Sequence, residues 1–331
     1  MTHLQNLPQP LPTETANDQL AALLKAAGDP LRLDILRVLT QDSFGVLELC
    51  QIFAAKQSGM SHHLKVLANA GLLTSRREGN SIFYRRAYLA PHHAFTPLLQ
   101  QLFVTLDQQP LPDAVAQALQ HLQHERGAAA QQFFIDNAHK FRAQQDLIAS
   151  YPVYADQIQQ LFSNTPLPGH NLALEIGPGE GEFLPLLAKS FARVVALDNA
   201  SSMLDKSRAF AADKQLHNIE FIHGDTRTLN QLNLLADCVV VNMVLHHTPS
   251  PADIFYDLSA ALRPGGALLI TDLCRHEQTW AREACGDLWQ GFDPQDFSRW
   301  ASAAGLQEGQ SIYFALRNGF QIQVRQFFKG H

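Results

Sequence analysis

Cysteine, charged residues and long apolar runs are all scarce in this chain of 331 residues. Its four cysteines form no CxxC pair, which excludes a disulfide framework and suits a reducing compartment. No run of 18 apolar residues occurs, so no membrane-spanning helix is expected. The first residues, MTHLQNLPQP, contain neither a basic region nor an apolar stretch, so we expect no signal peptide. These absences predict a cytoplasmic protein that does not associate with membranes.

Charge is distributed unevenly along the chain. In total, 25 lysines and arginines stand against 31 acidic residues, and the net charge of −6 argues against nonspecific coating of nucleic acid. The segment 56–86 differs, because Glu78 is the only acid in it. Its basic residues are Lys56, Lys65, Arg76, Arg77, Arg85 and Arg86. The segment therefore predicts a local basic face on an acidic protein.

Length and patterning predict a two-domain α/β protein. After a polar stretch at 163–171, short apolar strands alternate with helices, which is typical of βαβ units around a parallel sheet. Two β-rich runs flank Asn318 and Gly319, so the sheet should end in an antiparallel hairpin. The predicted segments are a flexible arm at 1–18, a first domain at 19–90, linker helices at 91–165, and a second domain at 166–331.

The pattern of residues 19–90 is four short helices followed by a two-stranded ribbon. Asp29 and Pro30 predict the cap and first residue of the second helix, and Gly71 predicts the end of the fourth. The ribbon turns at Gly79 and Asn80. Helices followed by a basic ribbon are typical of a winged helix-turn-helix, in which one helix meets base edges and the wing meets phosphates.

The fourth helix should bury Met60, Leu64 and Leu67 and expose a polar side. We expect DNA contacts from this polar side and from the wing, by Gln57, Ser58, Ser61, His62, His63, Lys65, Arg76, Arg77 and Asn80. Two alternatives to DNA binding remain open. In the first, the domain binds another protein and its basic residues are only a solvated surface. In the second, His62 and His63 are metal ligands.

Three stretches of this part, AAGDPLRLDILRVL, SHHLKVLANAGLL and SRREGNSIFYRRA, resemble the arsenical-repressor (ArsR/SmtB) family of dimeric transcriptional regulators. The resemblance implies double-stranded operator DNA as a partner and a homodimer, with the helix beginning near His92 at the dimer interface. Many members sense metals through a cysteine pair, but the matching stretch GVLELCQIF has only Cys50. We therefore expect no metal, and a signal that enters elsewhere.

The stretch LEIGPGEGEF is the strongest chemical motif of the second part. Three glycines at alternate positions follow Glu175, and they allow the backbone to turn tightly and approach a ligand. Glu182 breaks the GxGxxG spacing of dinucleotide sites, and no GK[ST] follows, so a phosphate loop is excluded. The acidic residues Glu175, Glu180 and Glu182 would repel phosphate and suit a ligand that carries positive charge.

Polar residues also end the next three predicted strands, and the carboxyl ends of parallel strands bind ligands. Asp198 ends the second strand, where a carboxylate can accept both ribose hydroxyls. Asp225 and Thr226 end the third, at a place suited to an adenine amino group. His246 and His247 follow the fourth strand. One of them is a weak candidate for a catalytic base, or both are loop histidines bonded to the backbone.

These segments, with LRPGG at 262–266, resemble class I S-adenosylmethionine-dependent methyltransferases. The resemblance implies a Rossmann-like, seven-stranded, mostly parallel sheet with a reversed last strand. It also implies S-adenosylmethionine or S-adenosylhomocysteine as the ligand, with the methionyl end near Glu175. The expected contacts are Glu175, Gly177, Pro178, Gly179, Gly181, Asp198, Asn199, Met203, Asp225, Thr226 and Asn242.

The whole chain is similar to bacterial regulators that join these two modules, including regulators of methionine and methyl-cycle genes that respond to S-adenosylhomocysteine. The first hypothesis is a transcriptional regulator whose operator affinity depends on the bound nucleoside. The alternative is an active small-molecule methyltransferase with an autoregulatory DNA-binding domain. A third hypothesis, arsenite methylation, would require converging thiolates. It is disfavoured, because Cys238 should lie in a buried strand.

Overall fold

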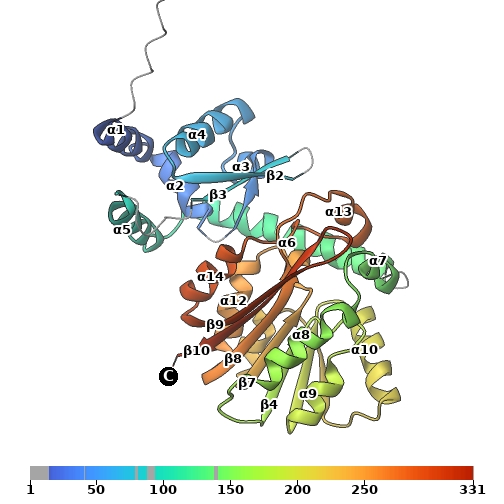
Figure 1. Ribbon diagram of the computed structural model, residues 1–331. Coiled ribbons are helices and arrows are strands. Elements are labelled where there is room, and N and C mark those ends of the chain that lie inside the picture. The colour runs from blue at the N-terminus through green and yellow to red at the C-terminus, as the bar shows by residue number, and fades with distance from the viewer. Residues whose placement is uncertain (1–14, 41, 79–80, 88–93, 138–140, 331) are drawn as a thin grey trace, which may run out of the picture. The chain divides into compact units, whose positions relative to one another are not determined.

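The computed structural model describes residues 15–40, 42–78, 81–87, 94–137 and 141–330, and it divides the chain into two compact units, Met1–Ala118 and Leu119–His331 (Figure 1). The predicted arm lies mostly outside these ranges, although Thr15 already caps a helix that begins at Ala16. The predicted border between residues 165 and 166 falls inside the second unit. Within the described ranges, none of the helices combines the length and the apolar character that crossing a bilayer requires.

The first unit is a small helical domain with a three-stranded sheet of order β1-β3-β2. Its elements are α1 (Ala16–Ala27), α2 (Pro30–Val38), β1 (Phe44–Gly45), α3 (Val46–Ile52), α4 (Gln57–Asn69), β2 (Leu73–Glu78), β3 (Ser81–Arg86) and α5 (Thr96–Asp107). The Asp29 carboxylate caps α2 by accepting from the backbone N–H of Arg32 at 3.0 Å, and Pro30 begins the helix, as predicted. Gly71, with φ +71°, follows the end of α4.

The helix α6 (Asp113–Asn137) leads from the first unit into the second. The elements that follow it are α7 (Phe141–Ile148), α8 (Tyr151–Ser163), β4 (Leu172–Ile176), α9 (Leu184–Ser190), β5 (Arg193–Asp198), α10 (Ser201–Asp213), β6 (Ile219–His223), α11 (Arg227–Leu232), β7 (Ala236–Asn242), η1 (Leu245–His247), α12 (Pro251–Ala260), β8 (Leu262–Leu273), α13 (Trp280–Cys285), α14 (Pro294–Ala303), β9 (Leu306–Ala315) and β10 (Gln321–Lys329).

The second unit is built on one seven-stranded sheet of order β6-β5-β4-β7-β8-β10-β9 (Figure 1). The pairs among β6, β5, β4, β7 and β8 are parallel, whereas β10 is antiparallel to both β8 and β9. This order confirms the predicted Rossmann-like sheet and its antiparallel C-terminal hairpin. The strand order reverses at β4 and β7, which is where open α/β sheets bind ligands.

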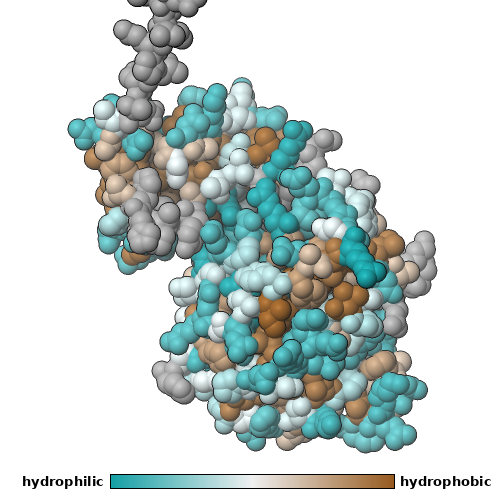
Figure 2. All heavy atoms as spheres, in the orientation of Figure 1, coloured by the Kyte–Doolittle hydropathy of each residue, from teal (hydrophilic) through white to brown (hydrophobic). Residues whose placement is uncertain are grey.

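Helices cover both faces of this sheet. On one face, Phe255 of α12 contacts Phe327 of β10 and Trp300 of α14, with ring centroids 5.7 and 5.8 Å apart. On the other face, Ile158 and Phe162 of α8 join the apolar core beneath the sheet. Helix α8 thus belongs to the second unit because its apolar side completes that core. On the viewed surface, apolar side chains form separate patches among polar ones (Figure 2).

Candidate functional site

The parallel register brings the polar ends of three strands to one edge of the sheet. Glu175 in β4 pairs with Ala196 in β5, so Asp198 lies two positions further along the neighbouring strand. On the other side of β4, Ile176 pairs with Val241, and Asn242 follows it at the end of β7. The structure therefore brings Glu175, Asp198 and Asn242 to the same edge, as the strand pattern predicts.

The glycine turn after β4 requires the conformations that the motif predicts. Gly177, Gly179 and Gly181 have φ values of +62°, +60° and +90°, a region that favours glycine. A Cβ atom on Gly177 would lie 2.6 Å from Cγ2 of Val244, so a side chain does not fit there. A Cβ atom on Gly181 would lie 3.2 Å from the ring of Phe210 in α10. The turn is thus closely packed as well as left-handed.

Two side chains of helix α10 contact the glycine turn. The hydroxyl of Ser207 donates to the carbonyl oxygen of Gly179 at 2.7 Å. The ammonium group of Lys206 pairs with the carboxylate of Glu180 at 2.8 Å. Because Lys206 pairs with the Glu180 carboxylate, Glu180 repels a phosphate less than its charge alone predicts. Pro178, also in the turn, is buried.

Three polar side-chain atoms at this edge are buried without hydrogen-bond partners among the described residues, although Asn242 as a whole is half-buried. Glu175 is 2% exposed and its Oε2 atom accepts no hydrogen bond. Neither Oδ1 nor Nδ2 of Asn242 has a partner. Burial raises the pKa of Glu175 from 4.5 to about 8. Buried polar atoms are normally hydrogen-bonded, so these atoms point to a polar ligand at the edge.

Asp198 is the last residue of β5, and the ribose contact expected of its carboxylate remains a prediction. Its Oδ1 atom accepts from the backbone N–H of Ala200 at 2.8 Å, which fixes the carboxylate at the start of α10. Burial raises the pKa of Asp198 to about 6, against the effects of this hydrogen bond and of nearby His223. Asn199 is exposed, and Met203 in α10 is buried.

Asp225 and Thr226 have protein partners. The carboxylate of Asp225 pairs with the guanidinium of Arg227, with Nε at 2.9 Å. The hydroxyl of Thr226 donates to Oδ2 of Asp257 at 2.5 Å. A ligand that contacts either side chain would have to share these partners. The predicted adenine contact at this strand end remains a prediction.

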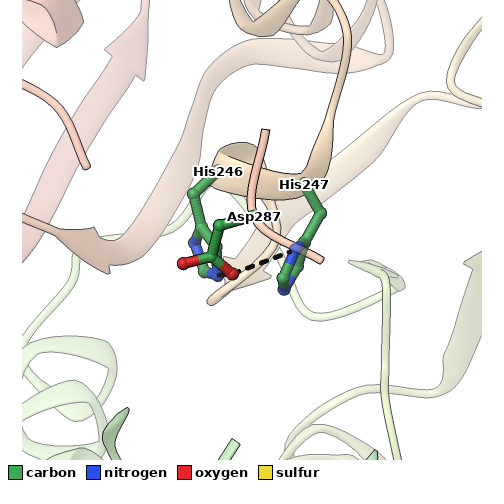
Figure 3. A group of neighbouring side chains, drawn as sticks. All are labelled: His246, His247 and Asp287. Atoms are coloured by element: carbon green, nitrogen blue, oxygen red, sulfur yellow. Dashed lines mark ion pairs between the residues drawn. The ribbon is translucent and has the colours of Figure 1, made fainter. Parts of the chain in front are cut away.

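His246 and His247 lie in the short helix η1 after β7, and Figure 3 shows Asp287 beside them. Nδ1 of His246 lies 2.7 Å from Oδ1 of Asp272 in β8. Asp272 also accepts from the backbone N–H groups of Leu245 and Leu273, at 2.9 and 2.7 Å. The Asp272 carboxylate thus fixes the orientation of the His246 ring.

Asp287 lies beside both histidine rings. Its Oδ1 is 3.8 Å from Nε2 of His246 and 3.6 Å from Nδ1 of His247, a contact drawn in Figure 3. All three residues are buried, at 0%, 7% and 1% exposure for His246, His247 and Asp287. Sequence reasoning missed Asp272 and Asp287, because only the fold brings them to the histidines.

Charge decides the protonation of the two rings. Burial lowers the pKa of His246, but the charges of Asp272 and Asp287 outweigh burial and raise this pKa to about 9. Burial and the neighbouring charge of His246 lower the pKa of His247. Burial raises the pKa of Asp287 to about 6, opposed by His246. With this pKa, His246 holds its proton at neutral pH, which argues against it as a general base there.

Helix α4 of the first unit is amphipathic, with an apolar side and a polar side. Met60, Leu64 and Leu67 are fully buried, as predicted. The expected base-reading residues on the other side are exposed, namely Gln57, Ser58, Ser61, His62 and Lys65. His63 is half-buried, with Nδ1 4.0 Å from Asp29. The helix therefore presents the polar surface that contact with base edges requires.

The wing supplies fewer exposed arginines than its sequence suggests. Arg77 in β2 is exposed, and Arg76 lies beside it in the same strand. Asn80 lies outside the described residues. Arg86 is 5% exposed, and its guanidinium donates to the carbonyl of Leu36 and pairs with Asp107, so it does not face DNA phosphates. That part of the expected basic face is wrong.

Two family models match the chain. Residues 27–76 match a helix-turn-helix domain, and residues 174–270 match a methyltransferase domain. The chain joins a helix-turn-helix domain to a methyltransferase domain. The first kind of domain indicates DNA binding, and the second indicates that S-adenosylmethionine or its demethylated product binds.

Curated relatives match the methyltransferase domain. A ubiquinone biosynthesis O-methyltransferase of Coxiella burnetii is 26% identical over 187 residues, which cover 52% of this chain and 78% of the relative. A trans-aconitate 2-methyltransferase of Variovorax paradoxus is 32% identical over 128 residues, which cover 37% of this chain and 48% of the relative. The similarity thus lies with methyltransferases of differing substrates.

Solved structures also align with this chain. The N-methyltransferase NodS of Bradyrhizobium japonicum, in complex with S-adenosylhomocysteine, has a TM-score of 0.43 and 16% identity, covering 58% of this chain and 99% of that one. A SAM-dependent methyltransferase from Aquifex aeolicus has a TM-score of 0.39 and 16% identity, covering 51% of this chain and 88% of that one.

The cysteines of the methyltransferase domain are poorly suited to arsenite. Cys238, Cys274 and Cys285 are all buried, the first at 0% exposure in β7, as predicted. Burial, together with the charge of neighbouring aspartates, raises the pKa of Cys274 to about 11 and that of Cys285 to about 12. Since thiolates are the ligands of soft ions, these protonated thiols disfavour arsenite methylation.

Proposed function

We propose that this protein is a homodimeric transcriptional regulator of the arsenical-repressor type. In this proposal, its affinity for operator DNA changes when S-adenosylmethionine or S-adenosylhomocysteine occupies the methyltransferase domain. It acts in the cytoplasm on genes of methionine and methyl-cycle metabolism. The observation that carries the proposal is a set of three buried atoms without hydrogen-bond partners, Oε2 of Glu175 and both polar atoms of Asn242, in a chain that also contains a helix-turn-helix domain.

The chemistry of the sheet edge supports a cationic nucleoside ligand. Glu175 would face the methionyl end, where its carboxylate offsets an ammonium or sulfonium charge. Asp198 would accept the two ribose hydroxyls. The left-handed turn at Gly177 lets the backbone approach the ligand. A phosphate-bearing ligand is disfavoured by the same carboxylates.

The first unit supports the DNA-binding half of the proposal. The polar side of α4 is exposed while its apolar side is buried, so the helix can enter a groove without losing core contacts. In α5, Leu98 and Val104 are 43% and 50% exposed, and we assign this helix to the dimer interface. A two-fold dimer implies an operator with two half-sites.

Ligand control requires unequal affinity of the nucleoside for the DNA-bound and DNA-free states. Couplings of this kind are typically about 1–3 kcal/mol, which changes operator affinity roughly 5- to 150-fold. The effect must be measured with the operator that the protein itself selects. Rounds of selection from a random duplex library provide that DNA without any assumption about target genes.

The deciding experiment measures binding of the selected duplex by fluorescence anisotropy, with and without saturating nucleoside. We expect S-adenosylmethionine or S-adenosylhomocysteine to change the dissociation constant at least about fivefold. Adenosine and methionine, the two halves of the ligand, serve as controls and should have little effect. Equal affinity under all conditions, in protein shown by calorimetry to bind the nucleoside, would exclude the regulatory coupling.

The second candidate function is methyl transfer to a small molecule, favoured by the curated relatives, which are methyltransferases. Because the pKa of His246 is raised to about 9, positioning of the two reactants rather than proton abstraction would supply the rate. Incubation with S-adenosylmethionine labelled on its methyl group and a small-molecule cell extract tests this function. Label transferred above the level of a boiled-protein control would support it.

A further inference from the structure

The group formed by His246, His247 and Asp287, here called the His–His–Asp cluster, is not used by the nucleoside site described above. Its three potential ligand atoms all lie within 4.8 Å of one another (Figure 3). Among the residues that the structure describes, it is the one such group of three or more histidine, cysteine or acidic side chains. His62 and His63 of α4 therefore join no comparable cluster within those residues.

The distances in the cluster match those between ligands of one metal ion. Zinc binds histidine nitrogen and carboxylate oxygen at about 2.0–2.2 Å, so two ligands of a tetrahedral ion lie about 3.4 Å apart. The Oδ1 atom of Asp287 is 3.8 Å from Nε2 of His246 and 3.6 Å from Nδ1 of His247. A contraction of a few tenths of an ångström would bring the Asp287 oxygen and each histidine nitrogen to the separation of two ligands of one ion.

Three polar atoms of the cluster have no hydrogen-bond partner among the described residues, two on Asp287 and one on His246. Neither carboxylate oxygen of Asp287 accepts a hydrogen bond from the described residues, and Nε2 of His246 has no hydrogen-bond partner. Asp287 is 1% exposed and His246 is fully buried. Leaving such atoms bare is costly, and a bound cation would satisfy them together.

Hydrogen bonds to neighbouring groups fix the orientation of both histidine rings. Asp272 holds Nδ1–H of His246 at 2.7 Å, so a metal ion would displace the proton on Nε2 and bind the lone pair that then faces the cluster. Nδ1 of His247 lies 3.3 Å from the carbonyl oxygen of Gly286, and its Nε2 lies 3.2 Å from the side-chain amide of Gln145. A metal ion at Nδ1 would replace the hydrogen bond to Gly286, and the Gln145 amide, turned by 180°, would accept a hydrogen bond from Nε2–H.

We propose that His246, His247 and Asp287 form a binding site for one divalent first-row transition metal ion. Two imidazoles and one carboxylate are a ligand set that such ions favour, and three protein ligands leave a coordination position open. The ion would join the end of β7 to the segment that carries Asp287. That segment is already attached there, because the N–H groups of Leu288 and Trp289 donate to the carbonyl of His246.

This inference departs from the expectation of no metal, which rested on the missing cysteine pair of the first domain. The spacing of the motif does not reveal the site, since Asp287 is far from the histidines in sequence. The proposal also stands apart from the proposed regulatory function. Its test measures metal binding alone and requires neither DNA nor a nucleoside.

The test uses the full-length protein without a polyhistidine tag, stripped of metal and titrated with Co²⁺. We expect one Co²⁺ per chain, with the visible absorption of an ion bound by nitrogen and oxygen ligands. Zn²⁺ should displace it at equal stoichiometry and raise the melting temperature. Failure of the wild-type protein to bind stoichiometric Co²⁺ or Zn²⁺ would overturn the proposal.

Variants assign the ion to the cluster. Asp287→Asn and His246→Gln should abolish the Co²⁺ spectrum, and Asp272→Asn should weaken the affinity roughly 10- to 100-fold as a loss of orientation. His217→Gln removes an exposed histidine of the same domain and should leave binding unchanged. Circular dichroism checks that each variant is folded. Binding retained in folded Asp287→Asn would refute the assignment and leave the cluster a buried ion-pair network.

Discussion

Replacing Glu175 by glutamine should change the stability of the methyltransferase domain in a pH-dependent manner. The unfolded chain loses the Glu175 proton near pH 4.5, whereas burial keeps the proton on the folded protein up to about pH 8. The folded state therefore binds more protons between these values, and wild-type stability falls as the pH rises through this window. The Glu175→Gln variant lacks this proton and does not lose stability by this route.

The size of the effect follows from the pKa. Each tenfold change in proton affinity corresponds to about 1.4 kcal/mol, so the group destabilises the folded state by about 3 kcal/mol at pH 7. Between pH 5.5 and pH 8, the variant should gain about 3 kcal/mol relative to wild type. The comparison between two pH values removes any constant cost of burying the new amide.

Urea unfolding followed by tryptophan fluorescence measures this change. Trp280, Trp289 and Trp300 are the only tryptophans and all lie in the second unit, so the signal reports that unit. Glu220→Gln is the matched control, since the Glu220 carboxylate is paired with Arg193 at the surface. We expect the control to follow the wild type.

The same substitution should have the opposite effect on ligand affinity. If the Glu175 carboxylate faces the positive methionyl end, losing a charge-assisted contact of about 1.5–3 kcal/mol weakens S-adenosylmethionine binding roughly 10- to 150-fold. Stability gained and affinity lost in one variant would identify a side chain kept for binding rather than for folding. Parallel pH profiles of wild type and Glu175→Gln would refute the reasoning.

Three further substitutions test other parts of the molecule. Lys65→Ala should weaken binding of the selected duplex and reduce the slope of log affinity against log salt by about 1, whereas Lys189→Ala in the second unit should not. Gly177→Ala should cost about 1–2 kcal/mol of backbone strain and also abolish nucleoside binding in calorimetry, because its Cβ would overlap a valine methyl. Gly71→Ala is the control, because Gly71 also has a positive φ, +71°, but no atom would meet its Cβ; it should lose stability through backbone strain and leave nucleoside binding unchanged. Asp198→Asn should lower S-adenosylhomocysteine affinity and remove a rise in affinity through about pH 6, and an unchanged pH profile would argue against the ribose contact.

The sheet and its ligand edge were predictable because their signals are local. A strand such as β7 reads as an unbroken apolar run, and it is buried along its length up to Asn242. The tight turn was predictable from the spacing of its three glycines, because each of them has a positive φ in the structure. Parallel register then places Glu175 and Asp198 together without further information.

Features that depend on distant contacts could not be read in this way. Helix α8 has an ordinary amphipathic pattern, and only packing shows that its apolar side belongs to the core of the second unit. Strand β1 has two residues, too few for a periodic signal. Asp287 meets the histidines through the path of the chain after β8, and Arg86 is buried although its neighbours in sequence suggest a phosphate contact.

Arg86 ties the wing to the helices on which it rests. It is the last residue of β3, and its guanidinium donates to the carbonyl of Leu36 in α2 while gripping both oxygens of Asp107 at the end of α5. Its charge also lies over the ring of Phe103, 4.6 Å from the centroid. A displacement of α5 would therefore be transmitted through Asp107 and Arg86 to the last residue of β3, at the base of the wing.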